Sequence, residues 1–274
     1  MADEAKGLIE TLRVKPGGKV KLKASDARGD QLFKDQDETK AATAALAESI
    51  NDLQDRLYAE RQRALLVVLQ GMDTSGKDGT VRDVFNATGP IGISIHAFGR
   101  PSELELAHDY LWRVHAACPR RGMIGIFNRS HYEDVLVPGA HGLLSKSEIE
   151  KRYEQINDFE RMLVENGTVV LKFMLHISKE KQAERLQERL DDPKKRWKFN
   201  PGDLDDRKLW DSFEEAYETM LESCSTKIAP WYVIPADRKW VRNAAIGQIV
   251  KATLEEMDPQ YPKPTWKPSD FQIT

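Results

Sequence analysis

Residues 71–78 read GMDTSGKD, preceded by the apolar run ALLVVLQ (residues 64–70) and followed by GTVRDVF (residues 79–85). A buried strand, a glycine-rich turn and a helix N-terminus together cradle phosphate, because backbone N–H groups and the helix dipole point into the turn. The spacing matches the pattern G-x-x-x-x-G-K, whose lysine reaches terminal phosphates. A glycine-rich turn that binds nothing is the alternative, and the flanking strand and helix make it the weaker explanation.

Two carboxylates set this loop apart from the usual P-loop. Asp78 stands where Ser or Thr normally holds Mg²⁺, and Asp73 lies inside the loop. A carboxylate among phosphate-binding groups repels the ligand unless a divalent cation lies between them, so we predict Mg²⁺ at Asp73. The residues expected to contact phosphate in this stretch are Gly71, Gly76, Lys77, Asp78, Gly79 and Thr80.

The bulk composition predicts a large α/β protein with nearly balanced charge. Its 274 residues include 41 Lys and Arg against 44 Asp and Glu, so an anionic ligand needs a local basic patch. The two cysteines follow no metal or redox spacing, which indicates a reducing compartment. No apolar run approaches the roughly 18 residues of a membrane span, and we expect a cytoplasmic protein.

Composition and periodicity divide the chain into an arm, a core and a tail. Residues 1–35, rich in Lys, Asp and Gly, predict an extended N-terminal arm. Residues 36–258 predict the core domain, in which residues 38–62 form an extra amphipathic helix on the outside. Four prolines break residues 259–274 into an extended C-terminal tail.

Within the core, apolar runs alternate with helical patterns. The expected strands cover residues 65–70, 93–98, 122–127, 168–175 and 231–234. Each of these strands is followed by an expected helix. The first helix starts at residues 79–85, and the others cover residues 103–117, 145–165, 178–190 and 241–257. This alternation predicts a five-stranded parallel α/β sheet in a three-layer sandwich, with ligands bound outside the carboxyl ends of the strands.

The third strand leads into the polar motif NRSHYED, which begins at Asn128. In P-loop enzymes the strand beside the loop delivers an acid toward Mg²⁺, and here that position is Asn128, a neutral ligand. Arg129 beside it is placed to meet a transferring phosphoryl group. The nearby acids are Glu133 and Asp134, and the alternative is a solvated turn in which Arg129 pairs with one of them. His131 has no partner at a chelating spacing, so we expect it to pack.

A basic segment, DPKKRWKFNP, occupies residues 192–201 after the fourth strand. Alone, such a charge run is typical of a solvated surface. A helix, a basic loop and a second helix after the fourth strand are, however, where nucleotide kinases of this architecture carry a mobile lid, which we expect at about residues 179–208. Trp197 and Phe199 are expected either to stack on a base or to pack against the core.

Four ordered motifs together resemble the polyphosphate kinase 2 family. They occupy residues 71–80, 127–135, 192–198 and 229–237, and the resemblance covers roughly residues 40–260. It implies a P-loop kinase fold with a helical lid. It also implies Mg²⁺-dependent phosphoryl transfer between inorganic polyphosphate and a nucleotide.

The resemblance also implies roles for single residues. The implied catalytic set is Asp73, Lys77, Asn128, Arg129 and Glu133, with Asp73 and Asn128 at the metal. The implied phosphate-binding lid cations are Arg185, Arg189, Lys194 and Arg196. Many relatives carry Asp at the position of Asn128 and Asn at that of Glu133, and the combination here resembles the subgroup that accepts AMP as well as ADP. Many of that kind also have Arg where this chain has Gly139.

The predicted activity is therefore a polyphosphate-dependent nucleotide kinase that forms ADP from AMP and ATP from ADP at one site. An ATP-dependent nucleoside monophosphate kinase and a non-catalytic polyanion-binding module are the alternatives. Asp73 and Asp78 favour the first, because the usual loop hydroxyl is missing and carboxylates weaken simple polyanion binding. We expect adenine nucleotides, with guanine nucleotides left open, a homo-oligomer, and no nucleic acid or membrane partner.

Overall fold

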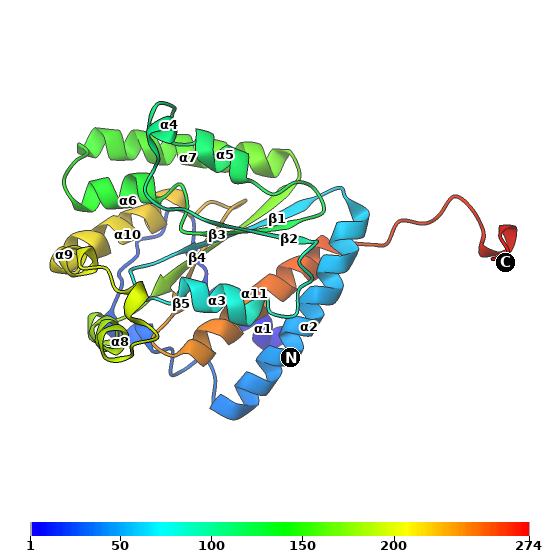
Figure 1. Cartoon of the computed structure of the whole chain (residues 1–274), viewed down its shortest axis with the longest axis horizontal. Coiled ribbons are helices and arrows are strands. Elements are labelled where there is room, and N and C mark those ends of the chain that lie inside the picture. The colour runs from blue at the N-terminus through cyan, green and yellow to red at the C-terminus, as the bar shows by residue number, and fades with distance from the viewer. Residues whose placement is uncertain (1, 274) are drawn as a thin grey trace.

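The computed structural model describes residues 2–273, which are built on one five-stranded sheet (Figure 1). The strands are β1 (Ala64–Gln70), β2 (Ile93–Ala97), β3 (Ile124–Asn128), β4 (Thr168–His176) and β5 (Trp231–Pro235). They pair in the order β2-β3-β1-β4-β5, and every pair is parallel. The predicted α/β fold with a five-stranded parallel sheet is therefore confirmed.

Helices cover both faces of this sheet (Figure 1). One face carries α1 (Ala2–Leu12), α2 (Gln36–Glu60), α3 (Lys77–Val84) and α11 (Lys239–Met257). The other face carries α5 (Trp112–Ala117), α6 (Glu133–Ala140), α7 (Lys146–Glu165) and α10 (Trp210–Cys224). Because both faces are covered, β1 is buried along its whole length, which explains its uninterrupted apolar sequence.

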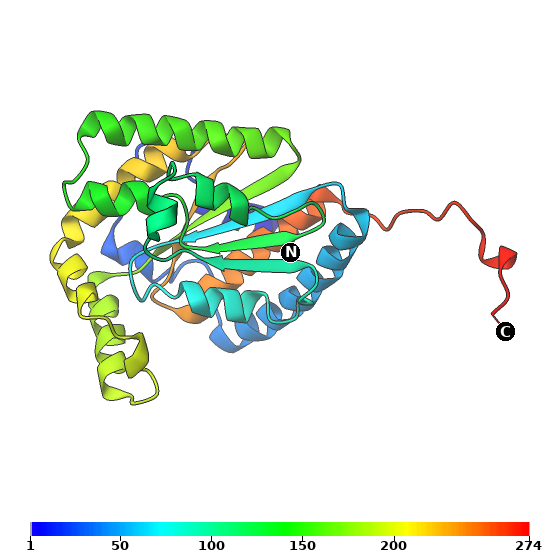
Figure 2. The ribbon, with the colours of Figure 1, turned by 45° about the horizontal axis from the view of Figure 1, so that its top comes forward.

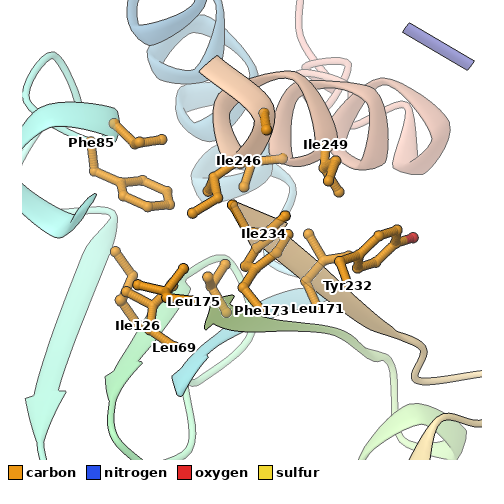
Figure 3. Close-up of a cluster of buried hydrophobic side chains, with 14 of the residues drawn as sticks. Leu69, Phe85, Ile126, Leu171, Phe173, Leu175, Tyr232, Ile234, Ile246 and Ile249 are labelled. Carbon is orange, nitrogen blue, oxygen red and sulfur yellow. The ribbon is translucent and has the colours of Figure 1, made fainter. Parts of the chain in front are cut away.

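Alternate side chains of β1 enter two separate hydrophobic cores. Leu65, Val67 and Leu69 belong to the core beneath α11, whereas Leu66 and Val68 belong to the core beneath α7 and α10. Figure 3 shows the first core, in which Ile246 and Ile249 of α11 lie over the side chains of β4 and β5.

The strand order determines where a ligand can bind. The chain moves from β1 to one side for β2 and β3 and to the other side for β4 and β5, so the crossover point lies at the carboxyl end of β1. Residues 71–76, which we call the glycine loop, leave the sheet there, and β3 ends beside them at Asn128.

The predicted lid, residues 179–208, stands at this edge of the sheet (Figure 2). It consists of α8 (Lys179–Asp191), the 3₁₀ turn η2 (Arg196–Lys198) and α9 (Gly202–Lys208). Ser178 caps α8 by accepting from the Lys181 N–H, and Asp237 after β5 accepts from both the backbone N–H and the hydroxyl of Ser178. The fourth sequence motif, which ends at Asp237, therefore anchors the base of the lid segment.

Residues 2–12 correct the prediction of an extended N-terminal arm, because they form helix α1. Leu8 and Leu12 of this helix are buried in the core beneath α11. The segment after it includes the short 3₁₀ turn η1 (Ala24–Ala27) and leads into α2, which begins at the N-cap Asp35 and confirms the predicted extra helix. Met1 lies outside the described residues.

Other element boundaries also differ from the predictions. The helix expected over residues 103–117 is two short helices, α4 (Glu103–Leu106) and α5, and Leu104 in the first of them is 64% exposed. The apolar stretch 135–140, not predicted as regular structure, belongs to α6.

The C-terminal segment leaves the body of the molecule as an extended chain (Figure 1). Residues 259–273 form no regular structure apart from the turn η3 (Pro268–Asp270), as the prolines predicted, and Thr274 lies outside the described residues. Among the helices described in residues 2–273, none combines the length and apolar character that a membrane-spanning segment needs.

Candidate active site

The glycine loop closes around the ammonium group of Lys77. Lys77 Nζ donates to the carbonyl of Gly71 at 2.7 Å and to that of Met72 at 3.3 Å. Burial and the nearby positive charge of Arg129 lower the pKa of Lys77 to about 8. These two carbonyls compensate the positive charge of the Lys77 ammonium only in part, so this charge favours binding of an anion at the loop.

Two glycines in this loop have no room for a side chain. Gly76 has φ 102°, and a Cβ there would lie 1.9 Å from a guanidinium nitrogen of Arg242. Gly71 has φ 150°, and its Cβ would lie 2.7 Å from the carbonyl oxygen of Leu175. Both glycines therefore let the backbone approach neighbouring elements closely, as a phosphate-binding turn requires.

Three of the predicted site residues form one chain of contacts. Arg129 donates from one nitrogen to Asp73 Oδ1 at 2.7 Å and from the other to Glu133 Oε2 at 3.2 Å. Burial acts to lower the pKa of Arg129, but the charges of Glu133 and Asp73 outweigh it and raise this pKa above its ordinary value. Arg129 is thus a permanent cation held between the glycine loop and α6.

Asp73 is ionised in this arrangement. Burial acts to raise its pKa, but the charges of Lys77 and Arg129 outweigh that effect and bring the pKa below its ordinary value. Arg129, whose guanidinium contacts Asp73, has a backbone φ of 64°, an uncommon conformation for a residue with a side chain.

The other predicted metal ligand, Asn128, makes a different contact. Its Nδ2 donates to Asp78 Oδ1 at 2.8 Å, and Asp78 Oδ2 lies 3.3 Å from Lys198 Nζ of the lid segment. Burial acts to raise the pKa of Asp78, but the Asn128 bond and Lys198 lower it on balance. The two predicted ligands therefore have different hydrogen-bond partners: Asp73 contacts Arg129, and Asn128 contacts Asp78.

A pocket opens between the glycine loop, α6, α10 and the two lid helices α8 and α9. Predicted residues Gly71, Asp73, Arg129 and Glu133 line it, together with residues that sequence reasoning missed. The missed lining residues are Met72, Leu136, Val137, Gln182, Asp203, Asp206, Phe213 and Tyr217. Phe213 and Tyr217 belong to the apolar face of α10. The sequence alone does not distinguish a helix face that lines a pocket from one that packs in the core.

Asp203 is the most informative of the missed residues. Burial and the charge of Asp73 raise the pKa of Asp203 to about 6, so two carboxyl groups face one another in this pocket. Arg189 donates to Asp203 at 3.2 Å. An acidic residue in the first turn of the helix after the basic segment was the available sequence signal, but it is also the ordinary preference of helix N-termini.

The predicted lid cations differ in their surroundings. Arg185 is buried, and its guanidinium donates to the carbonyls of Thr74, Ala236 and Asp237, each at 2.8 Å. It therefore braces the glycine loop against the end of β5, and its contact with phosphate stays a prediction.

The remaining lid cations are more accessible. Arg196 donates to the carbonyl of Leu190 at 2.8 Å, and both Lys194 and Arg196 are exposed. Arg189 is held by Asp203 and the Lys198 carbonyl. Trp197 is 78% exposed with Lys198 over its ring, so it does not pack on the core, one of the two alternatives expected from the sequence.

Arg242 of α11 is a second buried cation behind the glycine loop that sequence reasoning missed. It donates to the Ser75 carbonyl at 3.3 Å, and burial together with the charge of Arg185 lowers its pKa to about 10. Gly79 and Thr80, predicted to contact phosphate, lie at the start of α3 near this group: the Thr80 hydroxyl donates to the Gly76 carbonyl, and a Cβ on Gly79 would lie 3.1 Å from Arg242.

Comparison with known proteins identifies the family. The chain matches the family model described as polyphosphate kinase 2 over residues 33–262. An AMP/ADP-polyphosphate phosphotransferase from Meiothermus ruber is 52% identical over 257 residues, which are 93% of this chain and 96% of that protein. An ADP-polyphosphate phosphotransferase from Rhodopseudomonas palustris is 38% identical, over 92% of each chain.

A solved structure agrees with these matches. The crystal structure of polyphosphate kinase 2 from Arthrobacter aurescens TC1 superimposes with a TM-score of 0.91 and is 40% identical in sequence. The superposition covers 96% of this chain and 94% of that one. The resemblance carried by the four sequence motifs is thereby confirmed, and the chain belongs to the polyphosphate kinase 2 family.

Proposed function

We propose that this chain transfers the terminal phosphoryl group of inorganic polyphosphate to AMP and to ADP, forming ADP and ATP. As a member of this family it is a phosphotransferase, and the relative at 52% identity bears a name with both acceptors. The observation that carries the proposal is the chain of contacts Asp73–Arg129–Glu133. These three residues line one pocket together with the glycine loop, which Lys77 follows. The chain of contacts joins one fixed cation, Arg129, to two carboxylates where an acceptor phosphate would meet a donor.

The reaction needs positioning and charge neutralisation rather than a covalent intermediate. An oxygen of the acceptor's terminal phosphate attacks the terminal phosphorus of polyphosphate. The bond from that phosphorus to the next bridging oxygen breaks, so polyphosphate loses the unit that the nucleotide gains. Lys77 and Arg129 stabilise the charge on the transferring group, and the exposed cations Lys194 and Arg196 of the lid segment hold the polyanionic donor.

The residues present fit Mg²⁺, the metal that the family implies. Asp73 and Asp203 face one another in this pocket, where burial and the charge of Asp73 together raise the pKa of Asp203, and a bound cation would compensate the two carboxylates. Within residues 2–273, no group of three or more His, Cys, Asp or Glu forms a complete metal site, so phosphate oxygens would supply further ligands. Bound there, Mg²⁺ would neutralise charge on the phosphates.

Both alternative functions fit these residues less well. An ATP-dependent nucleoside monophosphate kinase would be expected to have a hydroxyl at the position of Asp78, whose carboxylate is instead held by Asn128 and Lys198. A simple polyanion-binding module gains nothing from carboxylates, yet Asp73 and Glu133 line the pocket.

The test is a product analysis by chromatography with purified protein and Mg²⁺. Polyphosphate with AMP should yield ADP and then ATP, and polyphosphate with ADP should yield ATP. ATP with AMP, in the absence of polyphosphate, serves as the control for an ordinary monophosphate kinase. ATP formed from ADP without any ADP formed from AMP would contradict the dual-acceptor part alone, whereas no polyphosphate-dependent product would contradict the whole proposal.

We further propose adenine nucleotides as acceptors, with guanine nucleotides left open, and a homo-oligomer in the cytoplasm. Exposed apolar side chains before, within and after the edge strand β2 in the sequence support the oligomer: Ile91, Ile95, Leu104 and Leu106. Cys118 and Cys224 are free thiols, as expected for a reducing compartment. Light scattering during gel filtration tests the oligomer, and parallel assays with AMP and GMP test the base.

A further inference from the structure

Gln70 is a buried polar residue at the carboxyl end of β1, in a strand that is otherwise Ala, Leu and Val. Its Nε2 donates to Glu133 Oε1 at 2.9 Å, and its Oε1 accepts from the Ser130 hydroxyl at 3.2 Å. Burying an amide without hydrogen bonds costs free energy. The motif that follows β3 avoids this cost by forming a hydrogen bond with each end of the Gln70 amide.

These bonds extend to the glycine loop. Glu133 presents its second oxygen to Arg129 at 3.2 Å, and Arg129 reaches Asp73 at 2.7 Å. A continuous path of hydrogen bonds therefore runs from Ser130 through Gln70, Glu133 and Arg129 to Asp73. Gln70 is the member that lies on the rigid centre of the sheet, whereas the residues that it links lie on loops or at a helix start.

The segment that Gln70 supports is also conformationally demanding. Arg129 has a positive φ of 64°, and its N–H donates to the Leu69 carbonyl at 3.0 Å. The Ser130 hydroxyl, which donates to Gln70, also accepts from the Tyr132 N–H at 3.3 Å. Uncommon backbone conformations persist only where surrounding contacts hold them, and Gln70 supplies one such contact from the neighbouring strand.

We propose that Gln70 is a positioning residue for phosphoryl transfer: its amide orients the Glu133 carboxylate, and through it the Arg129 guanidinium, toward Asp73 and the acceptor phosphate. The inference rests on the proposed roles of Arg129 and Glu133. It predicts that loss of the amide lowers the rate with the nucleotide acceptor while polyphosphate binding, which depends on Lys77 and the lid cations, stays nearly unchanged.

Gln70→Met removes the amide and keeps a flexible side chain of similar length. We expect kcat/KM for AMP to fall by at least about tenfold, which corresponds to about 1.4 kcal/mol, and KM for polyphosphate to change less than about threefold. The matched control is Gln54→Met, since Gln54 of α2 is also buried and lies beside Gly92, at the opposite end of the strands. The control should retain wild-type kinetics.

Gln70→Glu provides a readout that a merely structural role would not move. When protonated, the introduced carboxyl can donate to Glu133 as the amide does; when ionised, it repels Glu133. The charged or titratable groups around Glu133 are Arg129 and Asp134 on its own side, Asp73 and Lys77 from the glycine loop and α3, and Tyr217 from α10. Wild type has the same neighbouring groups around Glu133. Dividing the activity of the variant by that of wild type at each pH therefore leaves the effect of the introduced carboxyl.

This ratio should rise at least about fivefold from pH 8 to pH 6 for Gln70→Glu and stay level for Gln70→Met. Folding of each variant is checked by chemical denaturation. Wild-type kinetics in Gln70→Met, or a level ratio in Gln70→Glu, would overturn the positioning role. If wild type itself makes no ADP from polyphosphate and AMP, the proposed function fails instead, and the two failures are thereby distinguished.

Discussion

At the scale of single residues, the ammonium of Lys77 is the charge on which the glycine loop depends. We expect Lys77→Ala to lower polyphosphate-dependent turnover by at least about 100-fold, the size of effect that follows loss of one transition-state donor. The depressed pKa of Lys77 means that its charged form is disfavoured by folding, so the substitution should not lower stability. Steady-state kinetics and chemical denaturation check both parts, and near-wild-type turnover would contradict the phosphate role.

Asp73 is the residue through which we expect Mg²⁺ to act. Asp73→Asn keeps the shape of the side chain but removes the charge that faces Asp203 and Arg129. We predict lower activity and a Mg²⁺ concentration for half-maximal activity raised by at least about fivefold, because one anionic ligand is lost. Asp205→Asn, an exposed acid of α9, serves as the control. If the Mg²⁺ titration of Asp73→Asn matches wild type, Asp73 only holds Arg129.

The sequence predicted Asp73, Lys77, Arg129 and Glu133 because each belongs to a short local motif with a known role. Gln70 and Asp203 could not be predicted in the same way. Their contacts join residues 63 and 130 positions apart in the chain, from Gln70 to Glu133 and from Asp203 to Asp73. Only the strand order and the return of α9 to the sheet bring these pairs together.

At the scale of elements, the lid segment carries two kinds of cation. Lys194 and Arg196 are exposed, whereas Arg185 is buried. We predict that the double variant Lys194→Gln and Arg196→Gln raises KM for polyphosphate and makes this KM less dependent on salt, since each lost cation removes a screened phosphate contact. KM for the nucleotide should change less. The control pair Lys40→Gln and Lys251→Gln lies on α2 and α11.

Salt titrations of steady-state kinetics measure this effect. An unchanged salt dependence in the lid double variant would mean that its cations form a solvated surface, the interpretation that the sequence alone also allowed. Arg185→Gln should behave differently from the lid double variant. Because Arg185 joins the Thr74 carbonyl of the glycine loop to two carbonyls that follow β5, we expect Arg185→Gln to impair turnover and stability together.

A buried ion pair joins α7 to β4 beneath the motif that follows β3. Lys172 and Glu160 are almost completely buried and 2.5 Å apart, and Tyr132 and His131 both contact Glu160. Burial acts to raise the pKa of Glu160, but Lys172 and His131 hold it below its ordinary value of 4.5. A lowered folded-state pKa stabilises the protein above about pH 4.5, and this contribution is lost as the pH falls through the folded-state value.

We therefore predict that Glu160→Gln lowers the free energy of unfolding at pH 7 by about 3–5 kcal/mol, because the Lys172 ammonium is left buried without its partner. The difference from wild type should shrink as the pH falls below about 4.5, where wild type loses the same interaction. Replacing both residues by Met should cost less than Glu160→Gln alone. Chemical denaturation at several pH values measures all three, and a difference independent of pH would contradict the pair.

The strands and long helices could be predicted because their apolar runs and periodicity are local properties of the sequence. The break between α4 and α5 could not. Leu104, which fits the apolar side of a continuous helix, instead lies in a four-residue helix that ends at Leu106, and it is 64% exposed. Helix α6 was missed because it is short and contains Pro138, which normally interrupts helices.

At the scale of the whole molecule, the N-terminal segment is part of the core unit rather than an appendage. After α1, the Val14 N–H donates to the Trp231 carbonyl at 2.9 Å, and the N–H groups of Val20 and Leu22 donate to carboxylates of α10 at 2.9 and 2.8 Å. The charged and glycine-rich composition that predicted an extended arm reflects the exposed side of this segment, while its apolar residues Leu8, Leu12, Val14 and Leu22 are buried.

Truncation tests this division of the chain. Removing residues 2–23 exposes the partners of Leu8, Leu12, Val14 and Leu22, each of which contributes about 1.5–3 kcal/mol when fully buried. We predict a loss of several kcal/mol in the free energy of unfolding and reduced activity through the contact of this segment with β5. Removing residues 263–274 is the matched control, because Trp266, Phe271 and Ile273 are 53%, 64% and 101% exposed. Thermal and chemical denaturation compare the two truncations, and equal stabilities would show that the N-terminal segment is an arm after all.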